Sequence, residues 1–156
     1  MSSRTGSTAT RTGLAVYGTA CRRSTVKILA PVDSSERSRE ALRFAAEMVR
    51  AFGGELHAVH ITDVRGSHTE ELLDKARAVL DEEGIEEDPE VVMNLTLHRP
   101  RASDRVGRDI LRVAAEEECD HIVMGHYGDG RIGRAILGSA AETVVRAAEI
   151  PVTIIP

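Results

Sequence analysis

The sequence contains no tryptophan, and aromatic residues of all kinds make up only 3% of its 156 residues. Proteins that bind single-stranded nucleic acid stack bases on aromatic side chains, so a stacking surface of that kind is not expected. Residues 1–25 hold four arginines and no acidic residue, which leaves 16 basic and 25 acidic groups in residues 26–156. A net charge near −9 repels a polyphosphate backbone, and we expect no nucleic-acid partner.

Cysteines and long apolar runs are scarce as well. Cys21 and Cys119 are the only cysteines, and their separation matches neither a metal-binding nor a redox motif. Two reduced thiols in a cytoplasmic protein are the simplest interpretation. No apolar run approaches the ~18 residues that a membrane-spanning helix needs, so no membrane association is expected.

Residues 1–25 differ from the rest of the chain. They are rich in Ser, Thr, Gly and Arg and show no sustained hydrophobic period, which predicts a mobile N-terminal tail. Their composition is similar to that of an organelle transit peptide, but a cloning remnant or a start site placed too early explains them as well, and we favour these. One folded domain is predicted over residues 26–156.

This domain alternates short, β-branched apolar runs with segments of helical period. Strands are predicted at residues 26–32, 55–62, 91–98, 121–125 and 151–155, with helices at about 35–52, 69–83, 103–114 and 139–149. Such alternation indicates an α/β fold with a single doubly wound parallel five-stranded sheet and helices on both faces. Polar residues in 91–98 suit an edge strand and favour the order 3-2-1-4-5 over 2-1-3-4-5.

The order 3-2-1-4-5 reverses its winding between the first and fourth strands, where ligands bind at the carboxyl ends of open α/β sheets. The first strand ends near Asp33, and the fourth leads into MGHYGDGRIGRAILGS, with five glycines in residues 124–139. Residues 128–133 match G-x-G-x-x-G, but too little chain follows for a dinucleotide-binding half, and the lysine of a P-loop is missing. Neither motif is therefore assigned.

A mononucleotide fits this loop better. Ser139 and Glu142 have the spacing of a capping box, which predicts a helix starting at Ser139 whose first N–H groups form an anion site. Gly138, like Gly125 and Gly128 before it, would let phosphate oxygens approach the backbone closely. Asp33 could accept hydrogen bonds from a ribose or an adenine amine. A turn-rich surface loop, with Asp33 as a simple helix N-cap, is the structural alternative.

The spacing Gly125-x2-Gly128-x9-Gly138-Ser139, between IVMG and PVTIIP, resembles that of the universal stress protein family, as does VKILAPVDSSERSREAL. The resemblance covers residues 26–156 and is to the branch that binds ATP. It implies that ATP, with or without Mg²⁺, lies between the first and fourth strands. The residues implied for the adenosine end and its pocket are Asp33, the main chain at Val59, Pro31, Val32, Met124 and Gly125. Those implied for the phosphates are Gly128, Gly138, Ser139 and Ala140.

One residue departs from the family pattern. Ala141 stands where members of this branch often have a Thr or a similar side chain near the phosphates, which puts the strength of phosphate or metal binding in question. The last strand is apolar and would lie at a sheet edge, so we expect a homodimer that pairs this strand with its copy, as the resemblance also implies.

Two classes of function follow from this interpretation. The first is an ATP-binding regulatory or stress-response module without a catalytic residue. The alternative is a slow ATPase or a nucleotidyl-transfer enzyme on the same scaffold, and a flavin-binding electron-transfer protein is a third possibility. The sequence shows no nucleophile beside a base and an orienting acid, which favours the first class.

Overall fold

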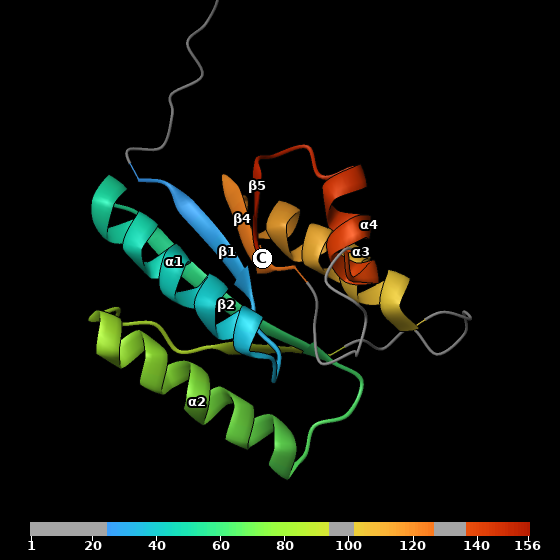
Figure 1. Ribbon diagram of the computed structural model, residues 1–156, viewed down its shortest axis with the longest axis horizontal. Helices are drawn as coiled ribbons and strands as arrows, with labels where there is room; N and C mark the ends of the chain where they lie inside the picture. Colours follow the sequence, from blue (N-terminus) through green and yellow to red (C-terminus); the bar gives the residue numbers. More distant parts are fainter. Residues whose placement is uncertain (1–24, 94–101, 127–136) are drawn as a thin grey trace, which may run out of the picture.

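The computed structural model describes residues 25–93, 102–126 and 137–156, in which strands and helices alternate along the chain (Figure 1). The strands are β1 (Lys27–Pro31), β2 (Glu55–Thr62), β3 (Glu90–Met93), β4 (His121–Gly125) and β5 (Val152–Ile155). The helices are α1 (Glu36–Phe52), α2 (Ser67–Glu83), α3 (Ala102–Glu116) and α4 (Ser139–Ala147).

The strands form one parallel sheet in the order β3-β2-β1-β4-β5, with a core cluster on each face. On one face, Leu42 of α1 and Leu73 of α2 pack with Ile28 and Val123 of the central strands. On the other face, the core residues of α3 and α4 pack with Leu29, Ile122 and Met124. The predicted α/β fold, its strand order and its two layers of helices are confirmed.

Helix α1 shows how local signals set these elements. The side chain of Ser35 accepts a hydrogen bond from the Ser38 N–H and caps the first turn. Gly53 ends the helix at φ +69°, a left-handed conformation that favours glycine. Both signals are visible in the sequence, because a serine before the apolar period and a glycine after it are typical of the two ends of a helix.

The predicted bounds differ from the structure mainly at element ends. The strands at 55–62 and 121–125 match β2 and β4, whereas α2 begins at Ser67, two residues earlier than predicted. Strand β3 is confirmed at the sheet edge over Glu90–Met93, and the rest of the strand predicted at 91–98 lies outside the described residues. In the described part of the chain, no helix combines the length and apolar content needed to cross a membrane.

A histidine ties the last two strands together. His121 Nε2 lies 2.8 Å from Thr153 Oγ1, linking β4 to β5. Burial lowers the pKa of His121 below its ordinary value of 6.5. The folded state therefore favours the neutral imidazole ring of His121. The stability that depends on this neutral ring is fully present above about pH 6.5. It is lost as the pH falls from 6.5 through the lower pKa of the folded state.

We expect His121→Gln to reduce the loss of stability on acidification, because glutamine can still bond Thr153 but does not titrate. Urea unfolding at neutral pH and at about pH 5 measures this, since the linkage relation makes stability follow the proton uptake of each state. The wild type should lose more free energy of unfolding between the two pH values than the variant does. An equal loss in the two proteins would show that His121 does not carry the effect.

Candidate functional site

Strands β1 and β4 part at the carboxyl edge of the sheet. Their paired residues are Ile28 with His121 and Leu29 with Ile122. By contrast, the pairing of β1 with β2 continues to Pro31 opposite Val59. The ladder between the central strands thus stops short of their carboxyl ends, at the point where the winding of the sheet reverses. This is the position of the ligand crevice in open α/β sheets.

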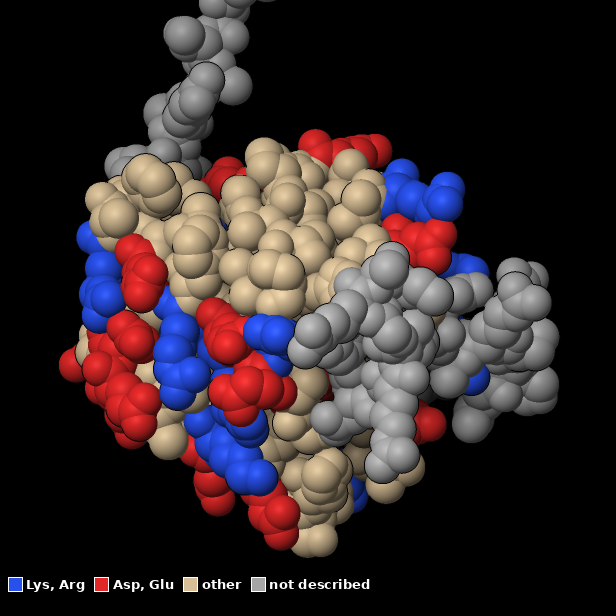
Figure 2. Space-filling view, viewed as in Figure 1, with Lys and Arg blue, Asp and Glu red and all other residues tan. Residues whose placement is uncertain are grey.

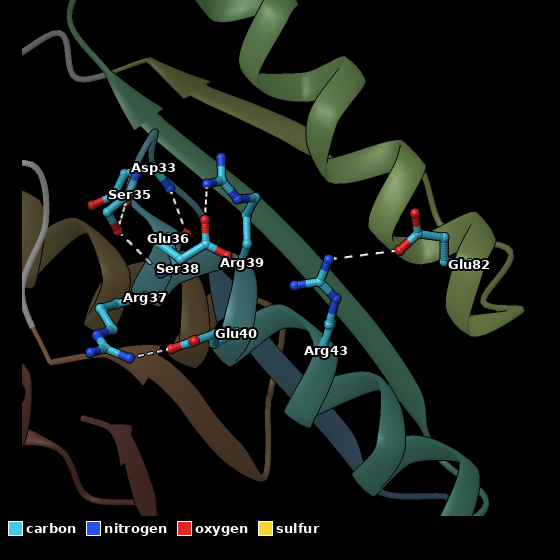
Figure 3. A network of polar contacts seen from close by, with 9 residues as sticks. All are labelled: Asp33, Ser35, Glu36, Arg37, Ser38, Arg39, Glu40, Arg43 and Glu82. Atoms are coloured by element: carbon cyan, nitrogen blue, oxygen red, sulfur yellow. Dashed lines mark hydrogen bonds and ion pairs between the residues drawn. The ribbon is translucent and has the colours of Figure 1, made fainter.

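Asp33 follows β1 at this edge and is held by the start of α1 (Figure 3). Its Oδ1 accepts hydrogen bonds from the Ser35 N–H at 2.9 Å and the Ser35 hydroxyl at 2.5 Å. Its own N–H donates to Ser38 Oγ at 2.8 Å. Asp33 is exposed, and Oδ2 takes no hydrogen bond from the described part of the chain. A pre-oriented carboxylate oxygen is therefore presented at the mouth of β1.

The peptide group before Asp33 is fixed from β2. His60 Nδ1 lies 2.8 Å from the Val32 carbonyl oxygen, and the Val32 N–H donates to the Val59 carbonyl at 2.8 Å. A carbonyl can only accept, so Nδ1 of His60 carries the proton in this contact. The N–H and the carbonyl of Val32 are thus both hydrogen-bonded to β2, which fixes the orientation of the backbone just before Asp33.

Gly125 ends β4 and packs against the first turn of α1. A Cβ built on Gly125 would lie 3.0 Å from the carbonyl carbon of Arg37 and 3.1 Å from the Ser38 nitrogen. In the structure this glycine gives room to the first turn of α1, and its predicted contact with a ligand stays a prediction. Since Ser38 also receives the N–H of Asp33, the end of β4 and the end of β1 are joined through α1.

The ion pairs of α1 lie beside this contact. Glu40 binds Arg37 at 2.6 Å, and Glu36 binds Arg39 on the same helix, as Figure 3 shows. These pairs are partly exposed, so each adds little to stability. They neutralise charge around the first turn of α1 and leave Asp33 as the exposed carboxylate that the sequence singled out.

Helix α4 starts at the same edge. The Gly138 N–H donates to the His126 carbonyl at 2.9 Å, and the His126 N–H donates to the Ile155 carbonyl at 2.7 Å. These bonds place the first turn of α4 directly beyond the carboxyl ends of β4 and β5. The start predicted at Ser139 is confirmed.

The predicted capping box is wrong. Gly138 occupies the N-cap position and has no side chain to cap the helix, so Ser139 is already the first helical residue. Glu142 instead binds Arg146 at 2.9 Å, one turn further along. The first N–H groups of any helix lack an acceptor within the helix. The N-cap Gly138 gives them no side-chain hydrogen bond, and Ser139 is exposed beside them.

The remaining predicted residues are mostly buried. Val59 has no exposed surface, and Val32 and Met124 are each 6% exposed. Their side chains pack in the core clusters that lie next to the carboxyl edge of the sheet. Ala141 is 2% exposed and packs in the core under α4, so its side chain points away from solvent. Gly128 lies outside the described residues.

A chain of contacts in the structure connects Asp33 at the end of β1 with Gly138 before α4. Asp33 binds Ser38, Ser38 packs on Gly125, and His126, which follows Gly125, binds Gly138. Sequence reasoning missed Ser38 and His60, whose contacts join residues of different elements.

Comparison with known proteins identifies the family. The model of the universal stress protein family matches residues 25–156. A curated universal stress protein of Methanocaldococcus jannaschii is 30% identical over 137 residues, which cover 83% of this chain and 81% of the relative. The chain belongs to the universal stress protein family.

Solved universal stress proteins share the fold. One from Archaeoglobus fulgidus is 28% identical with a TM-score of 0.65, over 84% of this chain and 93% of its own. A universal stress protein from the same organism, solved in complex with dAMP, is 27% identical with a TM-score of 0.63, over 86% of this chain and all of its own. Nucleotide binding is thus found among universal stress proteins similar to this one.

Proposed function

We propose that this chain is an ATP-binding regulatory module of the universal stress protein family, with the nucleotide held between β1 and β4. The observation that supports the proposal most is that a hydrogen-bond acceptor and a set of N–H donors lie at the same edge of the sheet, where they suit the two ends of a nucleotide. Asp33 offers an exposed carboxylate oxygen at the end of β1, and α4 begins with N–H groups that receive no side-chain hydrogen bond from the N-cap Gly138. A nucleoside hydroxyl or amine suits the first, and a phosphate suits the second.

The proposed roles follow from these positions. Asp33 accepts hydrogen bonds from the adenosine end, and Gly138, Ser139 and Ala140 donate main-chain N–H groups to the phosphates. Pro31, Val32, Val59, Met124 and Gly125 shape the pocket in between. Gly128 completes the phosphate contacts, as the family pattern implies. Mg²⁺, if it accompanies ATP, would be held chiefly by the phosphates, because the described residues contain no cluster of three or more His, Cys, Asp or Glu side chains placed to bind a metal.

A regulatory role is favoured over catalysis. Hydrolysis of ATP needs a group that positions or deprotonates the attacking water near the terminal phosphate. Asp33 is the carboxylate found at this edge among the predicted site residues, and its Oδ1 is engaged by Ser35. We propose that it binds the adenosine end and leaves the phosphates to main-chain donors. Slow ATP hydrolysis on the same scaffold is the alternative.

We also propose that the protein forms a homodimer through β5. The carbonyl groups of Pro151 and Ile155 accept hydrogen bonds from the β4 side. By the two-residue period of a strand, the main-chain groups of Val152 and Ile154 face the free edge. The surface over β5 is free of charged side chains in Figure 2. An apolar edge strand of this kind pairs readily with a second copy. Location in the cytoplasm stays a proposal, because the two cysteines of the sequence match neither a metal-binding nor a redox motif.

Extraction of nucleotide from the natively purified protein, followed by mass spectrometry, tests the function. We expect intact ATP, or binding of added ATP when the purified protein is empty. Release of ADP during incubation with ATP, abolished in the Asp33→Ala variant, would favour the ATPase instead. A protein that neither carries nor binds adenine nucleotides would contradict the proposal.

A further inference from the structure

Helices α3 and α4 approach each other closely at Gly107. A Cβ built on this buried glycine would lie 2.5 Å from Thr143 Cβ, 2.8 Å from Thr143 Cγ2 and 2.9 Å from the Ala140 carbonyl oxygen. Carbon atoms in contact lie about 3.5 to 4.0 Å apart. No side chain larger than hydrogen therefore fits at residue 107 unless α3 and α4 shift relative to each other or Thr143 moves.

The two facing residues belong to the start of α4. Ala140 is in the first turn, and Thr143 donates its hydroxyl to the Ser139 carbonyl at 2.9 Å. This bond fixes the rotamer of Thr143, which holds its methyl group toward Gly107. The face of α3 at Gly107 thus contacts α4 within the segment that carries Ser139 and Ala140.

The rest of α4 leaves little freedom to absorb a displacement. Ala141 and Val144 are 2% and 0% exposed and pack in the core beneath the helix. Gly138 is bonded to the His126 carbonyl at the end of β4. We therefore expect a side chain at residue 107 to move or tilt the first turn of α4 relative to the carboxyl edge of the sheet, because packed interiors do not compress.

We infer that Gly107 is a positioning residue for the phosphate end of the nucleotide site. It touches no ligand; its missing side chain lets the first turn of α4 lie where its N–H groups face the phosphates. The inference rests on the proposed function and adds a determinant, on a different helix, of how strongly the phosphates are held. Adenosine, which has no phosphate, should not respond to residue 107.

Calorimetric titration of Gly107→Ala with ATP and with adenosine tests the inference. We expect ATP affinity to fall by about 3- to 10-fold, the range for weakening one hydrogen bond, while adenosine affinity stays unchanged. Gly66→Ala is the control, because Gly66 is the N-cap of α2 and has open space around its Cβ position, so the change should alter neither affinity.

A compensating change separates positioning from general damage. Thr143→Gly removes both side-chain atoms that a Cβ at residue 107 would strike. ATP affinity of the double variant Gly107→Ala/Thr143→Gly should return toward that of Thr143→Gly alone. This comparison also serves if Gly107→Ala by itself does not fold.

The outcomes are distinguishable. Equal losses for ATP and adenosine, or unchanged binding of both, would overturn the role of Gly107 while leaving the proposed function standing. Absence of rescue in the double variant would overturn it as well. Failure of the wild type to bind ATP at all would instead refute the proposed function.

Discussion

Replacing Asp33 by Asn is expected to weaken ATP binding by about 10- to 100-fold, the range for losing a hydrogen bond to a charged group. Asparagine keeps an Oδ1 acceptor for the Ser35 N–H and hydroxyl, so the start of α1 stays capped. It replaces the exposed Oδ2 acceptor by a donor, which removes the proposed bond to the adenosine end. Inorganic triphosphate, which lacks that end, should bind the variant as it binds the wild type.

Isothermal calorimetry with ATP and with triphosphate provides the measurement. The matched control is Asp120→Asn, because Asp120 Oδ2 accepts the Lys27 N–H at the opposite edge of the sheet, where β1 begins. This control should leave both affinities unchanged. Equal losses for ATP and triphosphate in Asp33→Asn would mean that Asp33 supports the whole edge and does not recognise the nucleoside.

Replacing Ile154 by Lys is expected to convert the proposed homodimer to a monomer. The side chain is half-buried against the α3 and α4 cluster, and its main-chain groups face the outer edge of β5. A lysine at an edge strand blocks pairing with a second strand, because two like charges would meet across the two-fold axis. Light scattering over a range of protein concentrations measures the change in mass.

Two controls accompany this variant. Circular dichroism verifies that the monomer is folded, since Ile154 also packs inward. Val64→Lys places the same charge on an exposed residue between β2 and α2, with 69% of its surface accessible, and should leave the dimer intact. A wild type that is monomeric at micromolar concentrations, or a dimer that survives in Ile154→Lys, would refute pairing through β5.

The fold could be predicted because its signals are local and repeated. Apolar runs such as His121–Gly125 mark central strands, and a capping serine or a stopping glycine marks each end of α1. The strand order followed from the polar character of one strand and the rules of parallel sheets. The hydrophobic periodicity and the residues that begin or end each element were therefore enough to predict the architecture. The exact ends of the elements were predicted to within a few residues.

The site was predicted less completely, because close contacts between distant elements leave no periodic signal. The spacing of Ser139 and Glu142 suggested a capping box, but Gly138 takes the N-cap position and Glu142 bonds to Arg146. Gly125 was predicted to let a ligand approach, which stays a prediction, and its close contact with α1 was not predicted. A glycine pattern shows that something comes close to the backbone and does not show what.

Nuclear magnetic resonance of isotope-labelled protein titrated with ATP tests the central claim most directly, because it reports where the nucleotide binds. We expect the largest changes in amide shift at Asp33 and at Gly125 on the strand ends, together with Gly138, Ser139 and Ala140 at the start of α4. Saturable changes confined to this edge would support the site. Changes centred on the opposite edge, around Glu55 and His57 at the start of β2, or no changes at all, would contradict it.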